Sequence, residues 1–243
     1  MTDSTEQYLN GSYGEKHTDW HLDDAPYKVQ DIKEFLTLLL EQEDKSELKI
    51  AEVGAGVGGV LDEVVRYLKI LRQDLEVKAV GFEISPFATE IARTKFPELE
   101  FRVDFKKDAN VFDSTLFIDV LEHLEDPWSM LREAHKKAKY VIVRQPLLEN
   151  FSTFRHKNYQ EQREYWGHIK YFNYYSFLDM MTACGWEVLK IDLVPYWKLA
   201  KNSKKFGSPL LQSAIVSLNK VLVSYFLSGF YLNGIFKKID VKA

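Results

Sequence analysis

The sequence predicts one α/β domain in which a parallel sheet carries helices on both faces. Three observations predict it. Apolar runs that resemble strands alternate with helical patterns, a glycine cluster joins the first strand to the helix after it, and acidic residues fall at the ends of successive strands. In sheets of this kind ligands bind outside the carboxyl ends of the strands. We therefore expect the functional site at that edge.

The first half of the chain gives the clearest alternation. Glycines 54–59 lie between an apolar run and a helical pattern, and Pro86 suits the first turn of a helix because proline has no N–H to leave unpaired there. The elements expected here are a helix over 29–40, a strand over 48–53, a helix with Val60, Val64, Leu68 and Leu71 on one face, a strand over 77–82, a helix over 86–95 and a strand over 99–103.

The second half continues the order. Asp126 and Pro127 read as the N-cap and first residue of a helix, Pro146 is expected to close a strand, and Gly185 to cap a helix. The elements expected here are a strand that includes 116–118, a helix over 127–137, a strand over 140–143, a helix over 175–183 and a strand over 186–192.

The glycine cluster allows two interpretations. Gly54, Gly56 and Gly59 fit G-x-G-x-x-G, a dinucleotide-binding pattern, whereas Glu52, Gly54, Gly56 and Gly58 fit E-x-G-x-G-x-G. A carboxylate at the strand end opposes a pyrophosphate and suits a cationic ligand. Glu52 therefore favours the second pattern, and a glycine turn that serves packing alone is the remaining alternative.

Acidic residues follow further strands of the predicted sheet. Glu83 ends the second strand, where its carboxylate could accept hydrogen bonds from both hydroxyls of a ribose; a surface-loop acid is the alternative. Asp104 and Phe105 follow the third strand, where an acid could bind an adenine amino group and a ring could stack beside it. A role in the loop alone is equally compatible with Asp104 and Phe105.

The run from Phe112 to Pro127 contains D-x-L-E-H-L-x-D-P. This run resembles motif IV of the class I S-adenosylmethionine-dependent methyltransferases, and E-x-G-x-G-x-G resembles their motif I. With Glu83, the resemblance covers residues 45–195. It implies a Rossmann-like, doubly wound sheet of seven mostly parallel strands, and methyl transfer from S-adenosylmethionine to an oxygen or nitrogen of a small-molecule acceptor. The alternatives are an NAD(P)-dependent oxidoreductase and a non-catalytic cofactor-binding subunit.

The resemblance also implies roles for individual residues. The methionine part of the cofactor would border the glycine turn, the ribose and adenine would follow along the sheet edge, and the end of the fourth strand would form the floor beneath the sulfonium. The residues are, in that order, Glu52, Gly54, Gly56 and Gly58; Glu83 with Ile84; Asp104 with Phe105; and Asp119 with Val120.

Asp119, Glu122 and His123 also suggest a metal hypothesis. Some O-methyltransferases of the superfamily hold a divalent ion with a related E-x-x-E-H cluster, and a metal there could lower the pKa of an acceptor hydroxyl. Here the first position is Asp and the sequence identifies no further ligand. We favour a hydrogen-bonded turn formed by Glu122 and His123, and we expect no metal.

Residues 147–177 form an aromatic insert that we expect to shape the acceptor pocket; a helical cap whose aromatic residues are core is the alternative. Within the insert, Trp166–Phe172 resembles a G-H-x-x-x-F/Y run of many relatives. His168 is the first candidate for a general base, because an imidazole titrates near neutral pH, and His123 is the second. A structural hydrogen-bonding role is equally compatible with His168.

Residues 1–44 are expected to form a lid and the first helix, with Trp20, His21 and Lys28 near the cofactor or the acceptor. Residues 196–243 read as a helical extension. The apolar stretch from Leu210 to Phe236 fits an amphipathic helix that docks on the domain or on a partner subunit, such as a second copy in a homodimer. Peripheral contact with a membrane surface is the alternative. The final strand of the sheet has no clear position in the sequence.

Composition narrows the class of protein. The net charge is −4 over 243 residues, and no broad basic excess indicates nucleic-acid binding. The one cysteine, Cys184, excludes an internal disulfide, and residues 1–10 lack the pattern of a signal peptide. We therefore expect a cytoplasmic enzyme with no membrane span.

Overall fold

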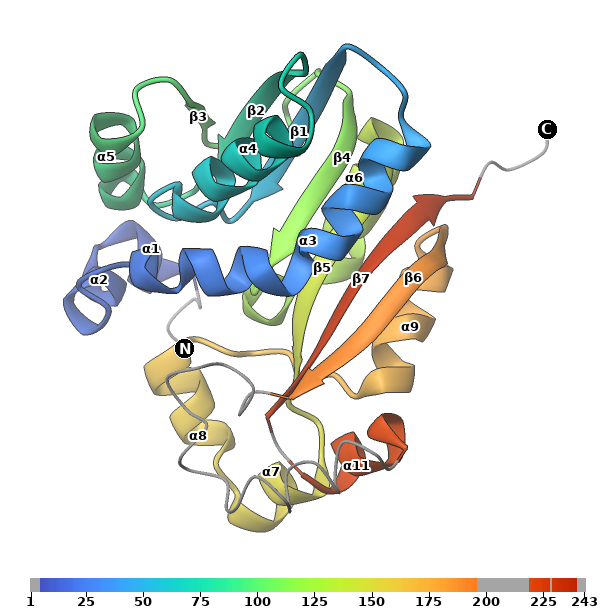
Figure 1. Cartoon of the computed structure of the whole chain (residues 1–243). Coiled ribbons are helices and arrows are strands. Elements are labelled where there is room, and N and C mark those ends of the chain that lie inside the picture. The colour runs from blue at the N-terminus through green and yellow to red at the C-terminus, as the bar shows by residue number, and fades with distance from the viewer. Residues whose placement is uncertain (1–4, 196–218, 228, 240–243) are drawn as a thin grey trace.

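The structure is a computed structural model that describes residues 5–195, 219–227 and 229–239. Seven strands form one sheet in the order β3-β2-β1-β4-β5-β7-β6 (Figure 1). All neighbouring pairs are parallel except those of β7, which runs antiparallel to both β5 and β6. The strands are β1 Glu47–Val53, β2 Glu76–Phe82, β3 Glu100–Arg102, β4 Phe112–Ile118, β5 Ala138–Leu147, β6 Trp186–Pro195 and β7 Phe230–Lys238. The predicted fold class, a seven-stranded, mostly parallel α/β sheet, is confirmed.

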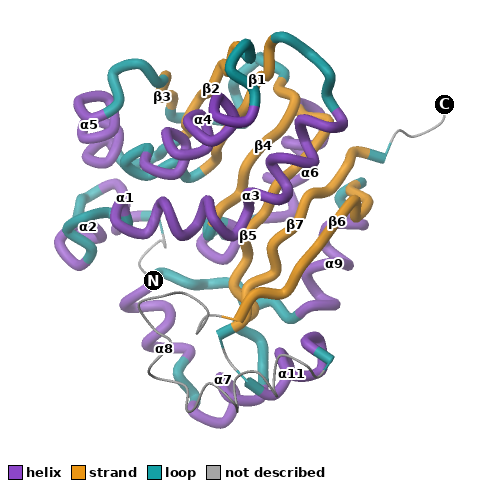
Figure 2. The backbone as a smooth tube through the Cα atoms, in the orientation of Figure 1, coloured by secondary structure: helices purple, strands orange, loops and turns teal. Residues whose placement is uncertain are grey.

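Helices cover both faces of the sheet. The apolar sides of α3 and α4 pack against one face, and those of α6 and α9 pack against the other, while α7, α8 and α11 gather at one end of the sheet (Figure 2). The helices are α1 Glu6–Leu9, α2 Ser12–Lys16, α3 Ala25–Gln42, α4 Gly59–Leu71, α5 Pro86–Lys95, α6 Pro127–Lys137, α7 Phe151–His156, α8 Tyr159–Glu161, α9 Tyr174–Ala183 and α11 Lys220–Phe226.

Local capping explains why α5 and α6 begin where the sequence predicted. The Ser85 hydroxyl accepts a hydrogen bond from the Ala88 amide at 3.3 Å, and the Asp126 carboxylate accepts one from the Ser129 amide at 2.9 Å. Each cap is followed by a proline, so the first helical residue leaves no N–H unpaired. These two helices therefore place the loops that follow β2 and β4.

Two expectations about strands need correction. The strand predicted over 140–143 is longer, because β5 continues through Pro146 to Leu147, with Pro146 opposite Tyr231 in β7. A proline lacks only its own N–H, so pairing can continue on both sides of it. The apolar stretch from 210 to 236 is also not one helix: α11 ends at Phe226, and β7 begins at Phe230. Residues 210–218 of that stretch lie outside the described residues.

The strand β7 is the final strand that the sequence analysis did not place. Six of its nine residues are buried, from both faces of the strand. A short apolar run without alternation cannot be distinguished from a buried helix by its periodicity. The remainder of the predicted extension, residues 196–218, 228 and 240–243, lies outside the described part of the chain. Within the described residues, no helix is long and apolar enough to cross a membrane.

Candidate active site

The carboxyl ends of the central strands open onto a cavity of about 420 Å³. Its walls come from the N-terminal segment, the turn after β1 and the loops after β2, β3 and β4. Nine of the ten residues predicted to bind a cofactor line it, namely Glu52, Gly54, Gly56, Glu83, Ile84, Asp104, Phe105, Asp119 and Val120. The tenth, Gly58, lies in the turn directly before Gly59, which does line the cavity.

Each glycine of the turn has a distinct physical role. Gly54, Gly56 and Gly58 all have positive φ angles, of 73°, 54° and 84°, which L residues with a side chain rarely adopt. A Cβ atom on Gly54 would lie 2.5 Å from Cγ2 of Val120, and one on Gly58 would lie 2.6 Å from the Phe101 ring. A Cβ atom on Gly56 would meet only open space. The turn therefore keeps its backbone exposed to a ligand at Gly56.

Glu52 lies at the end of β1 and is almost completely buried. Its Oε2 atom has no hydrogen-bond partner among the described residues. Burial raises the pKa of Glu52 to about 8, although the nearby charge of Lys28 opposes the shift. A buried carboxyl that lacks a full set of partners in the protein has the capacity to bind a cationic or hydrogen-bond-donating ligand.

Glu83 holds the loop after β2 against the glycine turn. Its Oε2 accepts a hydrogen bond from the Gly56 amide at 2.8 Å, and its Oε1 accepts one from the Ser85 amide at 2.7 Å. Burial raises the pKa of this carboxyl, and the backbone donors offset part of that effect. Each carboxylate oxygen can accept more than one hydrogen bond, so the predicted contact with ribose hydroxyls is compatible with both backbone bonds.

Asp104 and Phe105 border the same cavity, but both already have partners in the protein. The Asp104 carboxylate accepts hydrogen bonds from the Lys106 and Lys107 amides at 3.0 and 3.2 Å, which closes the loop after β3. The Phe105 ring is buried and packs edge-on against Phe82, with centroids 5.1 Å apart. Their predicted contacts with an adenine stay predictions.

Asp119 has an environment that the sequence analysis did not foresee. Its carboxylate lies 2.6 Å from Nη1 of Arg144 and 3.1 Å from Nζ of Lys28, and Arg144 also pairs with Asp31 at 3.0 Å. Burial alone would raise the pKa of Asp119, but the charges of Arg144 and Lys28 outweigh it and lower the pKa to about 2. Asp119 is therefore an ionised group that positive charges already neutralise.

The N-terminal helices close the cavity from the other side. Tyr8, Tyr13, Trp20 and His21 all line it, as the predicted lid requires. The Tyr8 and Tyr13 rings contact each other, with centroids 4.7 Å apart, and burial raises the pKa of both hydroxyls, so both stay protonated at neutral pH. The lid role of this segment remains a proposal that these contacts support.

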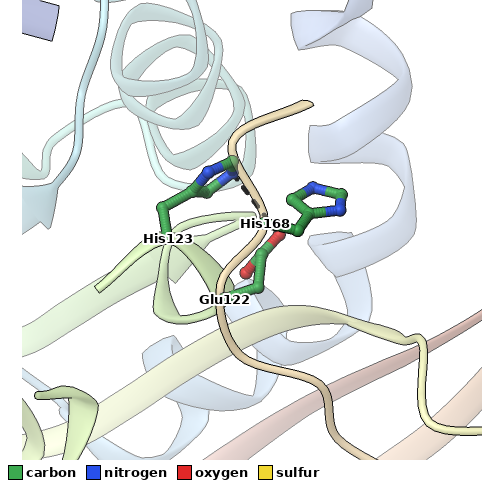
Figure 3. A group of neighbouring side chains, drawn as sticks. All are labelled: Glu122, His123 and His168. Atoms are coloured by element: carbon green, nitrogen blue, oxygen red, sulfur yellow. Dashed lines mark ion pairs between the residues drawn. The ribbon is translucent and has the colours of Figure 1, made fainter. Parts of the chain in front are cut away.

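Only one of the two candidate bases borders the cavity. His123 lines the cavity, whereas His168 does not belong to its lining and lies beside His123, with ring centroids 4.9 Å apart. Figure 3 shows these two rings together with Glu122. Burial lowers the pKa of His123 to about 3 and that of His168 to about 4. Both rings are therefore neutral near pH 7, and their role as bases stays a prediction.

The aromatic insert lies behind the lid. None of the described residues in 147–177 belongs to the lining of the 420 Å³ cavity. Instead, Nζ of Lys16 donates a hydrogen bond to the Glu164 carbonyl at 2.7 Å, and the His17 ring lies 5.2 Å from that of Tyr165, centroid to centroid. The insert thereby supports the segment that forms the cavity wall.

Arg144 is a functional neighbour that the sequence analysis did not name. It lies in β5, is only 3% exposed, and its guanidinium stacks on the Tyr231 ring at 3.7 Å. The sequence does contain a signal for this role, because Arg144 directly follows the apolar run 140–143 of a predicted strand. A buried arginine requires an acidic partner, but its partners lie 25 and 113 residues away along the chain.

Together, the seven-stranded sheet with β7 antiparallel, the glycine turn and the acids at the strand ends define the class I S-adenosylmethionine-dependent methyltransferases. A methyltransferase-domain family profile matches residues 23–191, well over half of the chain. The chain belongs to this family and is an S-adenosylmethionine-dependent methyltransferase. The open space over Gly56 suits this cofactor, and so does the Oε2 of Glu52, which has no partner in the described part of the chain.

Solved structures share the fold. The plantazolicin methyltransferase BpumL in complex with SAH has a TM-score of 0.62 and 12% identity, over 98% of this chain and 94% of that one. A putative sarcosine dimethylglycine methyltransferase from Galdieria sulphuraria has a TM-score of 0.59 and 17% identity, over 86% and 85%. Magnesium protoporphyrin IX methyltransferase from Synechocystis PCC 6803 with bound SAH has a TM-score of 0.56 and 12% identity, over 86% and 82%. At these identities the likeness shows the fold alone. A search of curated proteins finds no match.

Proposed function

We propose that the protein transfers the methyl group of S-adenosylmethionine to an oxygen or nitrogen of a small-molecule acceptor. The observation that carries this proposal is the size of the cavity, about 420 Å³. Ligand pockets range from roughly 300 to 1,000 Å³, so a cavity of this size that also holds the cofactor leaves room for only a small reacting part of the acceptor.

We expect the two walls of the cavity to have different roles in binding. Glu52, Glu83 and the backbone at Gly56 form the cofactor side of the cavity, and the rings of Tyr8, Tyr13 and Trp20 form the opposite wall. The cofactor supplies an electrophilic methyl group on a sulfonium. The chain has to orient the acceptor and keep water away, which aromatic walls on a closing segment achieve.

The names of the solved structures give indirect support. They mention plantazolicin, sarcosine, dimethylglycine and magnesium protoporphyrin IX. None of these compounds is a nucleic acid, and the net charge of this chain is −4. A small organic acceptor is therefore the class that we propose. Homodimer formation and membrane contact through residues 196–243 stay predictions, because most of that segment lies outside the described residues.

Calorimetric titration with S-adenosylmethionine, S-adenosylhomocysteine and NAD tests the cofactor side. We expect saturable binding of the first two and none of NAD. The Glu83→Ala variant should lose about 1–3 kcal/mol of cofactor binding, because a charged acceptor is removed. The Glu98→Ala variant, which removes an exposed acid before β3, is the matched control and should bind as the wild type does.

Turnover tests the acceptor side. A library of hydroxyl, carboxyl and amine compounds is incubated with S-adenosylmethionine, and release of S-adenosylhomocysteine is measured. We expect turnover with at least one small acceptor. Tight binding of S-adenosylhomocysteine without turnover on any member would contradict the proposal and would favour a non-catalytic binding subunit.

A further inference from the structure

Three side chains beside the cavity bring possible metal ligands together. Glu122 and His123 belong to the 3-10 turn after β4, Leu121–His123, and His168 follows the short helix Gln162–Trp166. One possible ligand atom from each residue lies within 4.8 Å of the others, and Oε1 of Glu122 lies 3.9 Å from Nε2 of His123. Figure 3 shows the carboxylate and the two rings grouped together.

Glu122 is the least satisfied polar side chain of the three. Its side chain is 1% exposed, and neither carboxylate oxygen has a hydrogen-bond partner of ordinary geometry among the described residues. An isolated buried carboxylate costs several kcal/mol, so a cation at this place would remove a real penalty.

The turn itself does not depend on the Glu122 side chain. The Glu122 backbone carbonyl accepts hydrogen bonds from the Ile169 and Lys170 amides, both at 2.9 Å. These bonds tie the turn to the segment that carries His168. The predicted hydrogen-bonded turn is thus formed by backbone groups. The Glu122 carboxylate is not needed for the turn and can bind a ligand.

Hydrogen-bond partners favour one tautomer for both histidines. Nδ1 of His123 lies 3.1 Å from the Gly167 carbonyl and 3.0 Å from the Tyr8 hydroxyl, and Nδ1 of His168 lies 2.8 Å from Oε1 of Gln162. The carbonyl and amide oxygens can only accept and a hydroxyl can accept as well, so a proton on each Nδ1 satisfies these contacts and leaves the lone pair on each Nε2. A neutral imidazole that is held by a hydrogen bond at its other nitrogen is the usual form of a metal-ligating histidine.

We propose that Glu122, His123 and His168 bind one divalent transition-metal ion at the wall of the cavity. Two imidazole nitrogens and one carboxylate favour ions such as Zn²⁺ or Co²⁺ over Mg²⁺ or Ca²⁺, which prefer oxygen ligands. Three protein ligands also leave a coordination position open. Asp119 is not a ligand, because Arg144 and Lys28 already bind its carboxylate.

The ligand atoms must move inward when the ion binds. Metal–ligand bonds of about 2.0–2.2 Å place ligand atoms roughly 3–3.6 Å apart, somewhat closer than the present spread of 4.8 Å. His123 lines the cavity, so an acceptor oxygen would be the natural fourth ligand. That last step rests on the proposed function, whereas metal binding itself does not.

The test uses the full chain after treatment with a chelator. Co²⁺ and Zn²⁺ are titrated by calorimetry, Co²⁺ also by its visible absorption, and Mg²⁺ serves as the comparison. We expect one equivalent of Co²⁺ or Zn²⁺ to bind, at least tenfold more tightly than Mg²⁺. The Glu122→Gln and His168→Gln variants should each weaken binding at least tenfold. The His156→Gln variant, which removes an exposed histidine of α7, should not change it.

Several outcomes would overturn the proposal. They are the absence of a saturable equivalent in the wild type, equal affinity for Mg²⁺, or an unchanged affinity in the His168→Gln variant. If Glu122→Gln does not fold, the His168→Gln variant and the Co²⁺ spectrum still decide. S-adenosylhomocysteine binding is measured in parallel. A chain that binds this compound but no metal contradicts only the metal site, and the reverse result contradicts only the proposed function.

Discussion

Two acidic residues at neighbouring strand ends differ in how their charge is neutralised. Glu52, at the end of β1, has one oxygen without a partner among the described residues, and burial raises its pKa to about 8. Asp119 follows β4, and Arg144 and Lys28 hold its pKa at about 2 despite burial. The two strands are adjacent in the sheet, because β1 pairs with β4.

The difference shows which acid is free for a ligand. The charge of Asp119 is already matched within the protein, so Asp119 serves to fix the loop after β4. Its φ angle of 55° is rare for a residue with a side chain, and its two ion pairs support that conformation. Glu52 lines the cavity, and its Oε2 atom can still accept a hydrogen bond from a ligand there. Acidic residues at two neighbouring strand ends therefore differ: Asp119 has a structural role, whereas the binding role of Glu52 stays a proposal.

The largest expected effect comes from removing the charge compensation of Asp119. The Arg144→Met variant leaves Asp119 and Asp31 without their shared guanidinium. Breaking a buried ion pair in this way typically costs about 3–5 kcal/mol. Urea denaturation should show that loss in the free energy of unfolding. If Arg144→Met together with Asp119→Asn is no more stable than Arg144→Met alone, the compensation is not the reason for the loss.

Gly54 directly follows β1, and a side chain there would meet Val120 in the loop after β4. A substitution at Gly54 therefore gives the next test. An Ala at Gly54 combines a left-handed backbone with a contact to Val120, and we expect a loss of about 2–3 kcal/mol in the free energy of unfolding. The Gly56→Ala variant is the matched control. It has only the backbone cost of about 1–2 kcal/mol, but its Cβ enters the space over the turn, so it should weaken cofactor binding more than stability.

Glu52 should produce a pH dependence of the opposite sign to that of a paired acid. Its pKa is higher in the folded chain, about 8 against an ordinary value of 4.5. Between these values the folded chain holds a proton that the unfolded chain has lost, so stability falls as pH rises and levels off above about pH 8. The slope is at most about 1.4 kcal/mol per pH unit.

The Glu52→Gln variant isolates this contribution. Free energies of unfolding are measured by urea denaturation for both chains at several values between pH 5 and pH 8, the range between the unfolded and folded pKa values of Glu52. We expect the stability of the wild type to fall relative to the variant as pH rises. Parallel pH profiles would show that Glu52 is compensated after all, and the contrast with Asp119 would disappear.

The smallest effect is expected at an exposed pair. Nζ of Lys107 lies 3.1 Å from Asp104, but the Lys107 side chain is 87% exposed. Exposed ion pairs contribute little, so the Lys107→Ala variant should unfold within about 0.5 kcal/mol of the wild type. A loss comparable to that of Arg144→Met would show that ion-pair burial does not explain the ranking.

Local signals in the sequence predicted much of the fold. The starts of α5 and α6 were predicted correctly because Pro86 and Pro127 mark them with adjacent caps. The strand ends were predicted because Glu52, Glu83 and Asp119 interrupt apolar runs. β7 was not placed, because its position between β5 and β6 depends on pairing with a strand more than 80 residues earlier, such as Ile142 with Ile235.

The site was predictable to the same degree. Residues that share a sheet edge follow from the order of strands, and nine of the ten predicted cofactor residues do line one cavity. Which partner neutralises which acid does not follow, because Arg144 meets Asp31 across 113 positions of the chain. His168 likewise reaches Glu122 and His123 only through the fold. Charge compensation is a tertiary property, and spacing in the sequence does not encode it directly.

The antiparallel insertion of β7 has a consequence for biosynthesis. β6 pairs only with β7, and β7 separates it from β5. While the ribosome is still making residues before Phe230, β6 has no strand beside it and β5 has an open edge. Unpaired edges invite association with other chains. Completion of the sheet must therefore wait until β7 has been synthesised, and a chain truncated before Phe230 would leave β6 without a partner strand and prone to aggregation.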